Sequence, residues 1–348
     1  MLNKKELNER IDTYLKENNN LFYLNNLTPI LHLLEQSKSL INPYEELGTN
    51  CIAINYHDKI DGLTSFELVR EYLYLLNPKY QDIFTKSLNN GTFGFADTIN
   101  DEVDYLTINC SGRKDKHLFF NVGFEGNILD GKILVHEFFH YLNTANYASR
   151  ELFTEFISIY NENKFLDYLK TKGYSDGDIT KAKLERYLGF YRIINPLYYE
   201  TLILNIGSLI GDFDYNFLMK YKDVLTFPSL TFEKWEEVLD TFLGKLKKCD
   251  GPNQHNQEKV TPDINYRYFL GTVLSCYLLT HEDENTHKRV LELNDKLASG
   301  LSLADSFNIL ELDLNNISSH DLVASVNNYY DKILTKEKEH QKIKIRSS

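Results

Sequence analysis

Three residues near the middle of the chain have the types and spacing of a metal-dependent hydrolase. His136, Glu137 and His140 form the pattern His-Glu-x-x-His within residues 133–142, an apolar run with helical periodicity. Because an α-helix turns by about 100° per residue, His136 and His140 lie on one face and can offer two imidazole nitrogens to one metal ion. Glu137 is offset by one position, so it points past the metal toward a bound water. This is where a general base is needed, and the motif therefore predicts a catalytic zinc site.

A catalytic zinc takes three protein ligands and leaves one position for water, so a third donor is expected on the next helix. Two glutamates qualify, Glu151 and Glu155. Glu151 falls in the first turn of that helix, where a carboxylate commonly serves only to complement the helix dipole. Glu155 lies a turn further in, among apolar neighbours, where a carboxylate is costly unless a cation compensates its charge. Without a metal ion, the ordinary explanation for Glu155 would be a position on the solvated face of an amphipathic helix. If His136 and His140 bind a metal, Glu155 is the preferred third ligand and Glu151 is the alternative.

Two residues that follow Glu155 are expected to support the site. Ser158 and Glu162 come three and seven positions later, so they share its face of the helix. Side chains in such positions can hydrogen-bond the metal ligands and fix their orientation.

The elements that must position these residues are mainly helices. Helical spacing of apolar residues recurs along most of the chain, including separate runs at residues 180–193 and 198–209. Only residues 105–110 and 117–122 have the pattern of β-strands. Asn127 or Asp130 is expected to cap the motif helix. The sequence therefore predicts a mainly α fold, with a small β-sheet beside the helix that carries the motif.

Composition narrows the possible partners. The 348 residues include 38 lysines and arginines against 50 aspartates and glutamates, which gives a net charge of −12. Such a surface repels nucleic acid and anionic membranes, so neither is expected as a partner. The four cysteines are widely spaced, which argues against thiolate metal sites and disulfide frameworks. No signal segment or run of about 18 apolar residues is present. We therefore expect a cytoplasmic protein, of undetermined oligomeric state.

Two segments after the motif carry a further pattern. Residues 155–162 read Glu-Phe-Ile-Ser-Ile-Tyr-Asn-Glu, and residues 262–271 read Pro-Asp-Ile-Asn-Tyr-Arg-Tyr-Phe-Leu-Gly. With the zinc motif, they resemble the oligoendopeptidase F and thimet oligopeptidase family of zinc metallopeptidases, which are gluzincins. That family has Glu-x-x-Ser-x-x-x-Glu after its zinc helix, and later a proline, spaced tyrosines and a glycine. Shorter likenesses at residues 75–80, 297–300 and 310–314 extend the resemblance over roughly residues 50–335.

The resemblance implies a zinc-dependent endopeptidase that hydrolyses oligopeptides. In that family the first glutamate of the second segment binds zinc, which favours Glu155 independently. One Zn²⁺ per chain would then be held by His136, His140 and Glu155, with Glu137 as the general base.

The resemblance also implies a tyrosine that stabilises the oxyanion, and a domain plan. A phenol suits that role because it is neutral at working pH and can donate a hydrogen bond. Tyr268 is the better candidate and Tyr266 the second, although most of the 24 tyrosines must be packing residues. The expected domains are an N-terminal helical extension at 1–45 and a gluzincin-type catalytic domain at 46–335. Residues 336–348 are charged and have no apolar face, so a disordered tail is expected there.

Departures from the family pattern leave other functions open. Phe139 replaces a glycine, only 14 residues separate His140 from Glu155, and a histidine before the tyrosine segment is missing unless His255 supplies it. Only about 50 residues stand in place of the family's N-terminal lobe, which predicts a more open cleft. One alternative is a retired peptidase that binds a peptide or protein partner without cutting it, although Glu137 argues against this. The other is a dedicated enzyme that processes a single partner.

Overall fold

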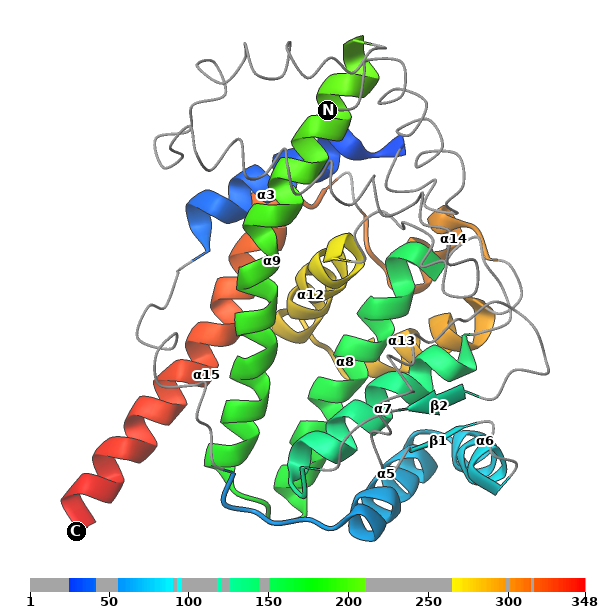
Figure 1. Ribbon diagram of the computed structural model, residues 1–348, viewed down its shortest axis with the longest axis vertical. Helices are drawn as coiled ribbons and strands as arrows, with labels where there is room; N and C mark the ends of the chain where they lie inside the picture. Colours follow the sequence, from blue (N-terminus) through cyan, green and yellow to red (C-terminus); the bar gives the residue numbers. More distant parts are fainter. Residues whose placement is uncertain are drawn as a thin grey trace, which may run out of the picture. The chain divides into compact units, whose positions relative to one another are not determined.

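The computed structural model describes residues 25–41, 56–89, 93–95, 118–120, 125–143, 150–210, 265–297, 301–313 and 316–347 (Figure 1). Most of these residues lie in helices, which confirms the predicted mainly α fold. In this part of the chain, no helix combines the length and the apolar character needed to cross a bilayer. The chain divides into two compact units, one of residues 1–40 and 192–269 and the other of residues 41–191 and 270–348.

The second unit contains the zinc motif and is centred on a pair of packed helices. These are α7 (Ile128–Leu142) and α8 (Arg150–Thr171), which run along each other. Its other helical segments are α5 (Gly62–Leu76), α6 (Pro78–Asn89), α13 (Thr286–Leu297), α14 (Leu303–Ile309), α15 (Ser319–Ser347) and parts of α9 (Asp176–Ile210) and α12 (Asn265–Thr280). Helix α5 packs against α6, α7 and α8, and α13 packs against α8 and α14 (Figure 1). The motif helix is therefore enclosed by helices from both sides of it in the sequence.

Local chemistry sets the ends of the helices around the motif. Asp61 caps α5 by accepting a hydrogen bond from the Thr64 N–H at 2.9 Å. Gly173 follows the C-terminal end of α8 and has a φ of +87°, a conformation that glycine adopts without steric cost. Its N–H donates to the Lys170 carbonyl, and the Tyr174 N–H donates to the Leu169 carbonyl, so α8 ends in a Schellman motif.

An aromatic cluster holds α7 against α6. The rings of Phe84 and Phe138 meet edge to face at 5.4 Å, and those of Tyr80 and Phe139 do so at 6.0 Å. All four side chains are almost completely buried. Edge-to-face pairs of this kind add to the stabilisation from apolar burial. Phe139, which directly precedes His140 in the sequence, is therefore a core residue.

The strands that the structure describes are short. Strands β1 (Phe93–Phe95) and β2 (Leu118–Phe120) pair in parallel, with Phe93 opposite Leu118. Strand β2 falls inside the predicted strand at residues 117–122. The predicted strand at residues 105–110 lies outside the described residues, so the small sheet expected beside the motif helix stays a prediction.

Two helices extend further than the sequence pattern predicts. Helix α15 continues to Ser347, where we expected a disordered tail at residues 336–348. The tail has four lysines and two glutamates, which are good helix formers and allow a helix without an apolar face.

Helix α9 runs through Pro196, where we expected a break between two helices. Leu197 and Tyr198, which follow this proline, are buried, and such packing can offset the one backbone hydrogen bond that a proline removes.

The first unit joins the N-terminal residues to the second half of α9. It contains α3 (Leu27–Leu40), where Thr28 Oγ1 donates a hydrogen bond to Asn205 Oδ1 at 3.0 Å. The Lys38 ammonium lies 4.0 Å from the ring centroid of Tyr198 and donates to the Tyr199 hydroxyl at 3.3 Å. Residues 192–269 thus group with the N-terminal segment, whereas we expected them in a catalytic domain at 46–335, separate from an extension at 1–45.

Candidate metal centre

The helix that carries the motif is fixed at its start by a capping box. Asn127 is the N-cap, and its side chain accepts a hydrogen bond from the Leu129 N–H at 2.8 Å. Asp130 completes the box by accepting hydrogen bonds from the N–H groups of Glu125, Gly126 and Asn127. Both residues that the sequence offered as caps therefore take part, which satisfies the free N–H groups at this end. The start of α7 is fixed two turns before His136.

Three predicted metal ligands meet between α7 and α8. His136 and His140 come from successive turns of α7, and Glu155 comes from the second turn of α8. The Nε2 atoms of His136 and His140 lie 3.0 Å apart. The Glu155 carboxylate places Oε2 at 3.3 Å from His136 Nε2 and Oε1 at 3.4 Å from His140 Nε2. All three side chains are buried, and together they form a group that could hold a metal ion.

The spacing of these donor atoms fits a small divalent cation. With metal–ligand bonds of about 2.0–2.1 Å at tetrahedral angles, neighbouring donor atoms lie about 3.3 Å apart. The three separations of 3.0, 3.3 and 3.4 Å are close to this value, with a different oxygen of Glu155 facing each histidine. Each ligand set of this kind also leaves one tetrahedral position for a fourth ligand. The residues present therefore fit a metal ion with two imidazole ligands and one carboxylate ligand.

Two neighbours on α8 contact the far nitrogens of the histidine ligands, as the sequence predicted. Glu162 Oε2 lies 3.2 Å from His136 Nδ1, and Ser158 Oγ lies 3.3 Å from His140 Nδ1. Both neighbours are buried. Contacts of this kind orient an imidazole and determine which of its nitrogens carries the proton.

Two basic residues near the site escaped the sequence analysis. Arg186 of α9 forms two hydrogen bonds with Glu162, from Nε to Oε1 and from Nη2 to Oε2, both at 2.7 Å. Lys132, one turn before His136, is buried and donates to the Ala182 carbonyl at 3.0 Å. Arg186 lies 24 positions after Glu162, so no local spacing could connect them. The only indication of a basic residue here was Glu162 itself, because a buried carboxylate requires a partner of opposite charge.

The charges around the site attract a cation. Burial opposes ionisation of His136, but the carboxylates of Glu155 and Glu162 outweigh it and raise its pKa to about 9. Burial also acts against the ionised form of Glu155, but the two histidines hold its pKa well below the usual value. Without a metal ion, a proton would thus occupy the space between these donors, and a divalent cation would displace it.

Glu137 has one carboxylate oxygen that is placed to accept a proton. Its side chain is half-buried, and its Oε2 atom is buried without a hydrogen-bond partner among the described residues. A buried carboxylate oxygen without a partner is uncommon and costly. Because Glu137 is adjacent to His136 and is not one of the three converging donors, it could accept a proton from a water at the site.

The remaining predicted residues are not placed against the metal site. Tyr266 and Tyr268 lie in the first turn of α12, in the other compact unit. Tyr266 is buried and its hydroxyl accepts a hydrogen bond from Arg267 Nε at 3.3 Å, while Tyr268 is half-buried. Glu151 lies in the first turn of α8 but its side chain is outside the described part, as is the whole of His255. The oxyanion role of the tyrosines stays a prediction.

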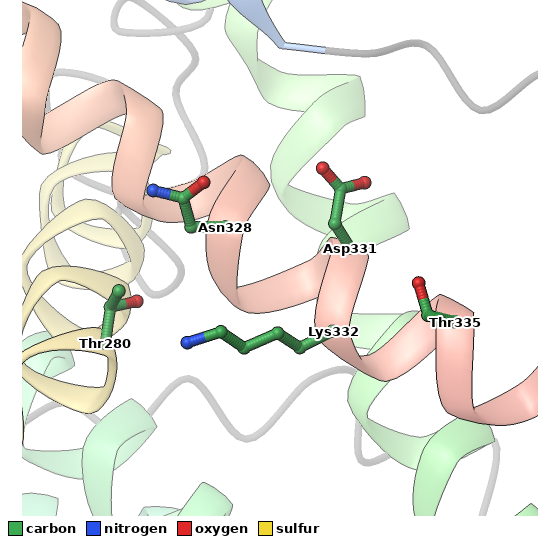
Figure 2. A pocket seen from close by; sticks show the side chains of 5 residues that line it. All are labelled: Thr280, Asn328, Asp331, Lys332 and Thr335. Carbon is green, nitrogen blue, oxygen red and sulfur yellow. The ribbon is translucent and has the colours of Figure 1, made fainter.

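A separate open pocket lies between α12 and α15. Figure 2 shows Lys332 of α15 reaching toward Thr280 at the end of α12. The pocket is lined by Thr280, Asn328, Asp331, Lys332 and Thr335. None of these residues belongs to the candidate metal centre, and their mixed charges do not select one class of ligand.

Comparison with known proteins adds no family assignment. No protein-family model, no curated protein and no solved structure shows significant similarity to this chain. The functional interpretation therefore depends on the residues of the site itself.

Proposed function

We propose that this chain is a zinc-dependent peptidase that hydrolyses oligopeptides at the centre formed by His136, His140 and Glu155. The observation that carries the proposal is the convergence of these donors beside Glu137, whose buried Oε2 has no partner in the described residues. A site that only bound metal would need the three ligands but not an adjacent carboxylate. A hydrolase needs both, because a water molecule must lose a proton as it attacks.

Zinc is preferred over other metals because of the whole motif rather than the ligands alone. Two histidines and one carboxylate also form the ligand set of non-haem iron oxygenases. The spacing His136-Glu137-x-x-His140 on one helix, followed by a glutamate ligand, is instead typical of zinc hydrolases. The proposal also agrees with the resemblance to the oligoendopeptidase F and thimet oligopeptidase family.

The reaction can be described through the chain's own residues. Zinc, when bound, lowers the pKa of a bound water to about 7 and polarises the scissile carbonyl. Glu137 accepts the proton that the water loses and returns it to the departing amine, so that one carboxylate serves both halves of the hydrolysis. Glu162 and Ser158 hold the histidine rings in place during these transfers.

Tyr268 is the preferred donor to the tetrahedral oxyanion because of the resemblance to the oligoendopeptidase F and thimet oligopeptidase family, with Tyr266 as the second candidate. Tyr268→Phe should lower kcat about 100- to 1,000-fold with little change in KM. Tyr266→Phe is the matched control, and an equal loss of kcat in both variants would contradict the assignment.

The proposed function is tested with a mixed peptide library and the Glu137→Gln variant. The parent protein should cleave peptides, and a chelator should stop the cleavage. Glu137→Gln should keep its fold and its metal but lose turnover, because an amide cannot accept the proton of the attacking water. Mass spectrometry of the library identifies the products. Cleavage by the variant at a rate close to that of the parent would rule out Glu137 as the base.

A further inference from the structure

Behind His136 lies a chain of charged groups that crosses from α8 to α9. Both oxygens of the Glu162 carboxylate accept hydrogen bonds at 2.7 Å from the Arg186 guanidinium. The same Oε2 atom also lies 3.2 Å from His136 Nδ1. The Glu162 side chain is only 1% exposed, so its charge is compensated by protein groups rather than by water. This geometry is the planar, two-point pairing that arginine forms and lysine cannot.

The pairing determines which nitrogen of His136 can bind a metal. An ionised carboxylate only accepts hydrogen bonds, so its 3.2 Å contact with Nδ1 is favourable only if Nδ1 carries the proton. Nε2 then carries the lone pair that a metal ion needs, and Nε2 is the atom that faces His140 and Glu155. A guanidinium on both oxygens favours the ionised carboxylate and fixes its plane. The orientation of the ligand is thus set from a third helix.

We infer that Arg186 is a positioning residue for the metal centre, acting through Glu162 to hold His136 in its metal-binding tautomer and orientation. The inference rests on the metal site of the proposed function. Arg186 Nη2 also lies 3.5 Å from His136 Nδ1, at the outer limit of a hydrogen bond, so the shorter 3.2 Å contact with Glu162 Oε2 determines the tautomer. Arg186 is not one of the three ligand residues.

The other nearby basic residue does not duplicate this role. The Lys132 ammonium donates to the Ala182 carbonyl at 3.0 Å and lies 4.0 Å from Glu185 Oε2. It contributes positive charge near Glu162, but its hydrogen bond is directed to α9 backbone. Removal of Arg186 would therefore leave the Glu162 carboxylate without its two-point partner.

A matched pair of variants separates positioning from general support of the fold. Arg186→Met removes the pairing with Glu162. Lys183→Met removes another α9–α8 ion pair, because Lys183 Nζ lies 2.6 Å from Asp167 Oδ1, away from the ligands. Zinc affinity is measured on metal-free protein by competition with a chelator, and thermal unfolding of the same samples reports the fold. The visible spectrum of the Co²⁺-substituted protein reports the geometry of the site.

Arg186→Met should weaken zinc binding about 10- to 100-fold and change the Co²⁺ spectrum. Lys183→Met should bind zinc within about threefold of the parent, since it leaves the ligand contacts intact. Equal losses in the two variants, or parent-like affinity and spectrum in folded Arg186→Met, would overturn the inference.

Arg186→Lys keeps the test decisive if Arg186→Met does not fold. It retains the charge but loses the two-point geometry, so its zinc affinity should fall by about 3- to 10-fold. Affinity equal to that of the parent would show that charge alone is sufficient and would overturn the positioning role.

If the parent binds zinc but cleaves no peptide, the proposed function fails while this comparison still decides the role of Arg186. If the parent binds no metal, both fail.

Discussion

The two histidine ligands sit one turn apart on the same helix but are supported by different chemistry. His136 is backed by the ionised pair Glu162 and Arg186, whereas His140 is backed by the neutral hydroxyl of Ser158. A carboxylate hydrogen-bonded to an imidazole makes it a more basic ligand, and a hydroxyl does so much less. Two histidines at equivalent positions of a sequence motif therefore need not bind a metal ion with equal strength. We expect His136 to be held more firmly in its metal-binding orientation than His140.

Between the two histidines, the larger loss of zinc affinity should come from removing the ionised support of His136. Glu162→Gln replaces the carboxylate with an amide of the same shape, which can accept or donate a hydrogen bond and so selects the Nδ1-protonated form of His136 less strongly. Zinc affinity, measured by chelator competition, should fall about 10- to 100-fold. Ser158→Ala removes the support of His140 and should cost less than about fivefold, because the lost hydrogen bond is neutral. Similar losses in the two variants would mean that the two ligands are supported equally.

A smaller effect is expected from a change that shifts the helix backbone at the third ligand, Glu155. Gly271→Ala would place a Cβ atom 2.8 Å from the Phe156 nitrogen and 3.0 Å from the Glu155 carbonyl carbon, so the backbone of α8 must shift. Overpacking of this kind costs about 1–3 kcal/mol. It should lower both the thermal stability of the metal-free protein and its zinc affinity.

Gly189→Ala provides the matched control for this change. Gly189 lies in α9, and an added Cβ atom would meet nothing within 4 Å. Alanine should therefore stabilise the helix by about 0.5–1 kcal/mol through its higher propensity, without affecting metal binding. If Gly271→Ala were also neutral or stabilising, close contact between α12 and Glu155 would not constrain the ligand.

Much of the metal centre was predictable because its parts are local in the sequence. The four-residue spacing of His136 and His140 follows from the pitch of a helix. The three- and seven-residue offsets of Ser158 and Glu162 from Glu155 follow from the same geometry. Periodicity also predicted the mainly α fold.

The features that were not predictable depend on packing between distant segments. Arg186 pairs with Glu162 from another helix, and Phe139 packs on Tyr80 of α6. Gly271 was recognised as part of a pattern, but its contact with Glu155 could not be inferred from spacing. The helix through the charged tail was missed because the absence of an apolar face was taken as absence of structure, whereas propensity alone favours a helix there.

The metal content of three purified proteins tests the central claim most directly. The parent protein, Glu155→Ala and Glu151→Ala are dialysed against zinc and then against buffer, and bound metal is counted by mass spectrometry. Glu155 supplies a carboxylate oxygen within 3.4 Å of each histidine Nε2 atom, so its loss should abolish retained zinc. We predict one zinc per chain in the parent and in Glu151→Ala, and none in Glu155→Ala. A parent without zinc, or zinc lost from Glu151→Ala but kept by Glu155→Ala, would contradict the account.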